Sequence, residues 1–431
     1  MSASVSSPAG EASRHFISNG SRRMGFIEFI ALMAWLMALP ALTIDIMLPA
    51  LPNIAAEFSL AVANDRQLMI TIYMLGFALG QLFYGPVSDR YGRKPMLYLG
   101  LFLYLLATLA VVFAGDYFWV LVARCAQGLA AAAPRILGIA IVRDAAAGRG
   151  MSRIMSFIMM VFIVVPIFAP LMGSALMQWW DWRYIFWFMM LSATVALLWT
   201  AIRLPETRFL QQAQSPNANT DPQVIPFGQA LKTVFTTPQT VGYSLAIGFV
   251  FGCVLAYVGS AQQIFGELYE LGDQFVLAFG AVASVMALSS ITNIRLVQRL
   301  GMRRISHVAL LTFTVLAVIY GLCGFPAKPP IAWFYAYLSV SFYALTLCMP
   351  NFNALAMEPM GKTAGLGSAV IGFYTTVAGA LFGWGFGQAY DGSVRPLVLG
   401  FFLMGAGALI SVLITERGRF AREPEQMLEQ N

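Results

Sequence analysis

Long apolar stretches recur along almost the whole of this 431-residue chain. Each is about as long as the 20 residues that an α-helix needs to cross the hydrocarbon of a bilayer. Hydrophobic residues make up 59% of the chain and charged residues only 11%, against about 25% charged in an average soluble domain. A water-soluble core cannot bury so much apolar surface, so the sequence predicts an all-α membrane protein.

We count twelve candidate spans in the apolar pattern. They cover residues 26–51, 68–87, 96–114, 118–142, 155–177, 182–202, 241–265, 275–296, 307–325, 331–354, 365–389 and 396–415. The longest polar segment, around QQAQSPNANTDPQ, falls between the sixth and seventh spans. Its composition is typical of a surface linker. The sequence therefore predicts two six-helix bundles, at 26–204 and 239–416, joined by a cytoplasmic linker at 205–238.

The distribution of Lys and Arg predicts the orientation, because short loops rich in these residues stay on the cytoplasmic side. An N-terminus placed inside leaves only Arg66, Arg183, Lys328 and Arg395 in outer segments. Residues 1–25 are polar and lack the apolar core of a signal peptide, so we expect a mostly disordered cytoplasmic tail there. A second cytoplasmic tail is expected at 417–431.

A weak repeat relates the two predicted bundles. DRYGRK at 89–94 follows the second span, and QRLGMR at 298–303 follows the eighth. Internal repeats of this kind are typical of secondary transporters, in which two bundles rock about a central binding site.

Several motifs resemble those of a known family. GPVSDRYGRK at 85–94 resembles the signature loop of the major facilitator superfamily, and LVARCAQG at 121–128 resembles its fourth-span arginine motif. PIFAPLMG at 166–173, WDWRYIFW at 180–187 and LPET at 204–207 are similar to segments of drug/proton antiporters with twelve spans. TIDIMLPALPNIAAEF at 43–58 and IVRD at 141–144 resemble the bicyclomycin and chloramphenicol resistance type. This resemblance implies a major facilitator fold around a central cavity.

The signature loop predicts a cytoplasmic latch that breaks and reforms as the bundles rock. An acid at a helix end can accept bonds from a neighbouring helix N-terminus, and the bases can pair with acids or lipid phosphate. Glycines are expected to supply tight turns. An alternative is that the bases only anchor the topology. The latch residues are Gly85, Asp89, Arg90, Gly92, Arg93 and Asp144.

Asp45 is the candidate for proton coupling, together with Arg124. An acid deep in a span is costly unless it faces a cavity or a partner. Pro49 cannot donate to the carbonyl of Asp45, so we expect the helix to be weakened there. A carboxyl group balanced between desolvation and a nearby arginine can load and release a proton. The alternatives are a structural role for Asp45 near the outer rim and a structural contact for Arg124, either to Asp45 or to a backbone carbonyl.

Polar residues in the spans are the candidates for the substrate cavity. Arg124 and Arg135 are 11 residues apart and therefore share one face of the fourth span. In the resembled family, spans seven and ten also line the cavity. The predicted cavity residues are Asp45, Gln127, Arg135, Tyr257, Asn351 and Asn353.

Span five is predicted to be kinked, because Pro166 and Pro170 each release a backbone carbonyl one turn back. We expect this bend and Gly173 to seal the two bundles on the outer side. Compared with the antiporter motif, Ala169 and Ser174 replace two glycines.

These features favour a proton-coupled exporter of small amphipathic compounds, with protons as the coupling ion and no cofactor. Two interior arginines favour neutral or anionic substrates. The chain contains no GxxxxGK[ST] loop and no enzyme constellation, and its cysteines and histidines do not form a metal pattern. We expect a monomer in the bacterial inner membrane, with both termini cytoplasmic, whose partners are substrate, protons and lipid and not nucleic acid. The alternatives are a proton symporter that imports a metabolite, and a non-transporting receptor or channel.

Overall fold

The computed structural model describes residues 17–19, 22–146, 148–207 and 227–418. Most of the predicted tails and the middle of the predicted linker lie outside these residues. Twelve helical segments of the described chain are long and apolar enough to cross a membrane, which confirms the predicted number. The fold is therefore that of a multi-pass membrane protein.

The first six spanning helices form one half of the molecule, which we call the N half. They are α1 (Phe26–Asp45), α3 (Leu68–Tyr91), α4 (Arg93–Phe113), α5 (Tyr117–Ala145), α6 (Gly148–Trp179) and α7 (Arg183–Arg203). Three short helices connect α1 to α3, namely η1 (Leu48–Ala50), α2 (Leu51–Glu57) and η2 (Ala63–Gln67).

The last six spanning helices form the C half. They are α10 (Pro238–Ala261), α11 (Phe275–Leu300), α12 (Met302–Leu322), α13 (Ile331–Met357), α14 (Ala364–Gln388) and α15 (Arg395–Thr415). Its short helices are η3, a π-helix (Gln262–Leu268), η4 (Gly272–Gln274) and η5 (Glu358–Thr363).

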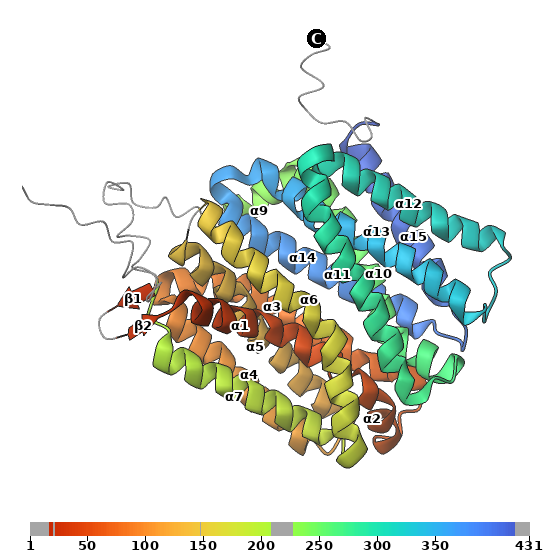
Figure 1. Ribbon diagram of the computed structural model, residues 1–431, viewed down its shortest axis with the longest axis horizontal. Helices are drawn as coiled ribbons and strands as arrows, with labels where there is room; N and C mark the ends of the chain where they lie inside the picture. The colour runs from red at the N-terminus through yellow and green to blue at the C-terminus, as the bar shows by residue number, and fades with distance from the viewer. Residues whose placement is uncertain (1–16, 20–21, 147, 208–226, 419–431) are drawn as a thin grey trace, which may run out of the picture.

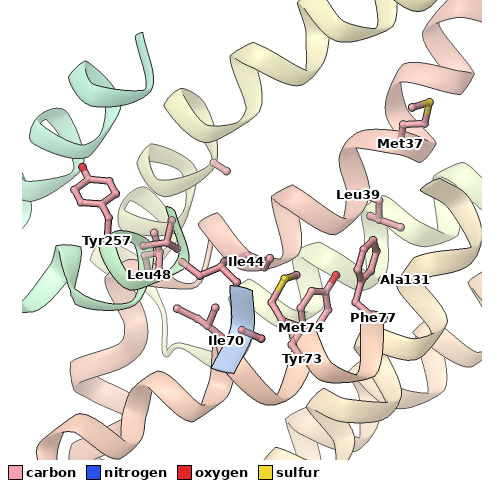
Figure 2. Packing of buried hydrophobic residues seen from close by; sticks show 14 of the residues in the cluster. Met37, Leu39, Ile44, Leu48, Ile70, Tyr73, Met74, Phe77, Ala131 and Tyr257 are labelled. Carbon is pink, nitrogen blue, oxygen red and sulfur yellow. The ribbon is translucent and has the colours of Figure 1, made fainter. Parts of the chain in front are cut away.

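The two halves lie side by side, with α3 packed on α14 and α6 packed on α11 (Figure 1). One buried apolar cluster runs across the boundary and includes Ile44, Leu48 and Ile70 of the N half and Tyr257 of the C half (Figure 2). Burial of apolar side chains in this cluster stabilises the contact between the halves.

The glycines of the sequence repeat occupy equivalent turns. Gly92, between α3 and α4, has a φ of 102°, and Gly301, between α11 and α12, has a φ of 77°. A side chain is strained at such angles, which explains glycine in both halves. Gly85 is different, because it lies inside α3 with φ outside the positive range. The prediction that Gly85 forms a tight turn is therefore wrong.

Two segments predicted as tail and linker contain regular structure. Strands β1 (Ile17–Asn19) and β2 (Arg22–Met24) pair in antiparallel orientation. Strand β2 contacts α7, and its last residue, Met24, is fully buried. The expected tail therefore contains a short stretch of strand, whereas residues 1–16, to which most of the prediction of disorder applies, lie outside the described residues. In the linker, α9 (Phe227–Thr236) is a helix that packs on α14.

The bundle has two ends. The tail end carries β1, β2 and the connections from α3 to α4 and from α11 to α12, and the far end carries the segments 46–67 and 262–274 (Figure 1). The sequence predicts that the tail end is cytoplasmic.

Candidate functional site

Amide side chains join the two halves at the far end. Asn64 of η2 donates from Nδ2 to the carbonyl oxygens of Gln388 and Tyr390, both at 2.9 Å. In return, Gln388 Nε2 donates to the carbonyl of Asn64 at 2.9 Å. The Asn64 side chain also accepts from Gln263 Nε2 at 2.6 Å. One asparagine therefore binds two separate segments of the C half.

Gln67 lies one turn further and adds two more bonds between the halves. Its Nε2 donates to Gln263 Oε1 at 2.5 Å and to the carbonyl of Gly387 at 3.1 Å. A Cβ on Gly387 would lie 1.9 Å from Gln67 Oε1, so a side chain at this position would displace the Gln67 amide from the place it has here. Gln67 is 2% exposed, which means that its bonds are made away from water.

An ion pair completes this contact. Arg66 Nη2 lies 2.6 Å from Glu267 Oε1, with the arginine buried and the glutamate half exposed. We call the set Asn64, Arg66, Gln67, Gln263, Glu267 and Gln388 the far-end seal. The sequence analysis missed these residues except Arg66, because amides near helix ends carry no periodic signal.

The middle of the interface has one further polar contact. Gln81 of α3 donates from Nε2 to Thr376 Oγ1 of α14 at 2.8 Å. A Cβ on Gly372 would lie 2.4 Å from Gln81 Oε1, so the two helices approach closely at this level.

At the tail end, the predicted latch residues come together within the N half. Arg93 pairs with Asp89 at 2.5 Å and with Asp144 Oδ2 at 3.0 Å, and it also donates to Ser88 Oγ at 2.7 Å. Asp144 is fully buried, whereas Asp89 is largely exposed. Arg90 is also exposed and lies over the ring of Tyr91.

The segment after α7 binds the same corner. Glu206 accepts from the backbone N–H groups of Arg93 and Lys94, each at 3.0 Å. These groups begin α4, where N–H groups lack partners within the helix and a carboxylate is favourable. Lys94 Nζ donates to the carbonyl of Leu204. The start of the linker is therefore fastened to the N half.

The C half repeats this corner with different residues. Arg303, at the position of Lys94 in the sequence repeat, pairs with Glu416 at 3.1 Å and with Glu358 at 3.2 Å. Tyr243 donates to Glu416 at 2.5 Å and lies 3.0 Å from Nε2 of the buried His307. Each tail-end cluster thus joins helices of a single half.

Asp45 is the last residue of α1 and is 7% exposed. The helix ends at this residue and Pro49 lies in the following η1, in agreement with the predicted weakness. Among the described residues, no cation lies within 4 Å of its carboxylate and no side-chain hydrogen bond reaches it.

Arg124 of α5 is fully buried and binds within the N half. It donates from Nε to the Met69 carbonyl at 3.1 Å and from Nη1 to Gln127 Oε1 at 2.6 Å. Its guanidinium group lies 4.5 Å from the centroid of the Tyr73 ring. Nη2 has no partner among the described residues. The structure thus contains the carbonyl contact and not an Arg124–Asp45 ion pair.

The other cavity candidates differ in exposure. Gln127 is fully buried between α5 and α4 and donates to Thr108 Oγ1 at 2.7 Å. Arg135 is half-buried on the same helix. Tyr257 is 2% exposed and packs on the rings of Phe279 and Phe342, at centroid distances of 5.6 and 4.6 Å. Gln127 and Tyr257 are therefore closed off in this conformation.

On α13, Asn351 uses both hydrogens of its amide nitrogen, one to Asn293 Oδ1 and one to the Leu347 carbonyl, each at 2.8 Å. Asn353 is exposed on the same helix. Asn293 is half-buried on α11 and was missed by the sequence analysis, although an amide within an apolar span is a visible signal.

Helix α6 contains both Pro166 and Pro170. A Cβ on Gly173 would lie 2.0 Å from the carbonyl oxygen of Ile46, so this glycine packs α6 against the residue that follows Asp45. That contact lies within the N half. Helix α6 contacts the C half near Pro166, where Ile167 lies against Gly280 of α11.

Two six-helix halves that pack against each other are an architecture typical of secondary transporters. A model of the Major Facilitator Superfamily matches residues 24–384. The chain belongs to this superfamily, and it is a transporter of small molecules and not an enzyme.

Curated relatives include transporters of bacteria. The MFS-type transporter YdgK of Bacillus subtilis is 30% identical over 369 residues, which cover 84% of this chain and 88% of the relative. A bicyclomycin resistance protein homologue of Haemophilus influenzae is 27% identical, over 89% of this chain and 94% of the relative. The multidrug resistance protein MdtL of Escherichia coli is 26% identical, over 79% of this chain and 83% of the relative.

Solved structures have the same fold. The xylose transporter XylE of E. coli, in a partially occluded inward-open conformation, superposes with a TM-score of 0.68 at 15% identity. The match covers 90% of this chain and 96% of XylE. The human organic anion transporter MFSD10 superposes with a TM-score of 0.64 at 16% identity, over 90% of this chain and 98% of that chain.

Proposed function

We propose that this protein is a proton-coupled exporter of small neutral or anionic amphipathic compounds. The observation that carries the proposal is Asp45, an acid buried at the end of α1 with no cation within 4 Å among the described residues. A buried acid without a fixed partner is costly as an anion, and it is therefore suited to exchange a proton when its surroundings change.

The relatives support export. One is named for bicyclomycin resistance and another for multidrug resistance, and both match most of this chain. The predicted cavity and proton-coupling residues include two arginines, Arg124 and Arg135, and one acid, Asp45. This excess of positive charge favours neutral or anionic substrates.

The proposed cycle uses protons as its coupling ion and needs no cofactor. Substrate enters from the cytoplasmic tail end while the far end is closed. Once the far end has opened to the outside of a bacterial inner membrane, the substrate leaves and a proton binds to Asp45. The two halves then exchange which end is open. Only noncovalent contacts change in this cycle. The free energy of the proton gradient drives the substrate out, because substrate and protons use the same conformational change in opposite directions.

The test is transport in proteoliposomes with an imposed pH gradient and chloramphenicol as a neutral amphiphilic probe. Wild-type protein is expected to move the probe against the proton flux, and Asp45→Asn is expected to abolish that coupling. Asp116→Asn is the matched control, because Asp116 only caps α5 through the Phe118 N–H and asparagine caps equally well. Probe flux in the direction of the protons would indicate a symporter, and coupling retained by Asp45→Asn would refute the role of this carboxyl group.

A further inference from the structure

The last turn of α1, which carries Asp45, is tied to two neighbouring helices by hydroxyl groups. Thr43 Oγ1 lies 2.6 Å from the hydroxyl oxygen of Tyr104 on α4. Tyr73 of α3 donates to the carbonyl oxygen of Pro40 at 3.3 Å. Pro40 interrupts the backbone bonding of α1 at this level, so side chains hold the turn where the backbone is weakened.

The direction of the Thr43–Tyr104 bond follows from counting hydrogens. A hydroxyl group has one hydrogen to donate. Thr43 Oγ1 donates its hydrogen to the carbonyl of Leu39 at 2.7 Å. The hydroxyl of Tyr104 must therefore be the donor to Thr43.

The backbone of α4 at Tyr104 is connected to Arg124 by a buried set of bonds. Arg124 donates to Gln127, and Gln127 donates to Thr108. Thr108 Oγ1 in turn donates to the Tyr104 carbonyl at 2.6 Å. Arg124, Gln127, Thr108, Tyr104 and Thr43 are all fully buried. Such a set of bonds is rigid, because every broken bond would leave a polar group unpaired away from water.

We propose that Thr43 and Tyr104 are positioning residues for the proton site. Their bond fixes the last turn of α1 against α4 and the Arg124 cluster, and it thereby keeps the Asp45 carboxyl group in its nearly water-free position. The inference rests on the proposed function, because it assumes that Asp45 binds the coupling proton. Arg124 of α5 lies near both Tyr73 and Tyr104, and Arg135 of the same helix lies near Tyr73.

Infrared titration of the purified full-length protein tests the proposal without a substrate. The C=O band of protonated Asp45 is identified by its loss in Asp45→Asn, and its pH dependence gives the proton-binding constant. Tyr104→Phe and Thr43→Val each remove the bond, and both are expected to weaken proton binding about fivefold, the worth of one ordinary hydrogen bond. Water then reaches the carboxyl group, because the turn is no longer fixed.

Three controls separate positioning from general damage. Tyr84→Phe removes a hydroxyl group that is equally buried but has no partner among the described residues, so the titration should not change. Thr43→Ser keeps the hydroxyl and should behave as wild type. The double variant of Thr43→Val and Tyr104→Phe should equal Thr43→Val alone, because the bond that Tyr104→Phe removes is already absent from Thr43→Val.

The outcomes distinguish the two levels of the account. If Tyr104→Phe and Thr43→Val titrate as wild type while Asp45→Asn loses the band, the positioning role is overturned and the proposed function stands. If Asp45→Asn loses no titrating band, the proposed function itself fails. Should Tyr104→Phe not fold, the comparison of Thr43→Val with Thr43→Ser decides the question by itself.

Discussion

The two ends of the molecule use polar side chains in opposite ways. At the far end, Asn64, Arg66 and Gln67 reach across to the C half. At the tail end, the ion pairs that the structure describes, such as those of Arg93 and Arg303, each join helices of one half. The far end therefore holds the halves together in this conformation, whereas the tail end braces each half separately.

The strength of the far-end seal suits a gate. A hydrogen bond contributes about 1 kcal/mol net, so the few bonds of the seal amount to a few kcal/mol. Two conformations of one protein typically differ by a similar amount. The seal is thus strong enough to favour the closed far end and weak enough for a ligand that prefers the open conformation to shift the balance.

The comparison changes how the predicted latch is understood. The sequence analysis assigned Asp89, Arg93 and Asp144 to a contact that breaks as the halves rock. In this structure their ion pairs lie within the N half. A role between the halves remains a prediction for another conformation.

The largest effect is expected from removing the ion pairs that Arg93 makes with Asp89 and Asp144 at the tail end of the N half. Arg93→Leu leaves the carboxylate of Asp144 buried without its partner. Removing one member of a buried ion pair typically costs about 3 to 5 kcal/mol. Thermal unfolding in detergent should show a clearly lower midpoint.

The pair of Arg203 and Glu28 serves as the control, because it also lies at the tail end but is open to solvent, with the arginine side chain 46% and the glutamate side chain 25% exposed. Exposed pairs contribute little, so Arg203→Leu should unfold close to wild type. An equal decrease in the unfolding midpoint of both variants would show that burial does not make the Arg93 ion pairs more stabilising than the Arg203 pair.

A smaller effect is expected from Gln67→Leu at the far end. Its bonds to Gln263 and Gly387 are buried, so their loss leaves acceptors unpaired at a cost of about 1 to 3 kcal/mol, which is about 5-fold to 150-fold in the open population. The reporter is a cysteine at the buried Ile70, behind the seal, in a background without the four native cysteines. Alkylation by an impermeant maleimide should accelerate accordingly.

The smallest effect is expected from Arg66→Gln with the same reporter. Glu267 is half exposed and is rehydrated when its partner is removed, so the gain in alkylation should be at most about fivefold. A larger gain for Arg66→Gln than for Gln67→Leu would show that charge, and not burial, determines the strength of the seal.

The spanning helices could be predicted from the sequence because bilayer thickness dictates their length. The turns at Gly92 and Gly301 also follow from the repeat, since only glycine is unstrained at their φ values. Gly85 was misjudged, because a glycine in a motif does not by itself distinguish a turn from a helix interior.

The site was less predictable. Asp45 and Arg124 are conspicuous as charges inside apolar spans, but whether they touch depends on helix packing. The far-end amides Asn64, Gln67 and Gln263 left no signal, because neutral polar residues near helix ends are common and their partners lie about 200 or more residues away. Tyr257 could not be told from a cavity residue until its neighbouring rings were known.

The central claim is that the far end opens when the tail end closes. Double electron–electron resonance measures the distance between two spin labels, and each pair of labels here has one member in each half. The labelled positions are exposed: Val62 and Glu270 at the far end, and Tyr91 and Leu300 at the tail end. The protein is reconstituted in lipid and compared at high and low pH. We expect the low-pH sample to gain a longer distance at the far end and a shorter one at the tail end. Distances that change at one end alone, or that lengthen at both, would contradict alternating access.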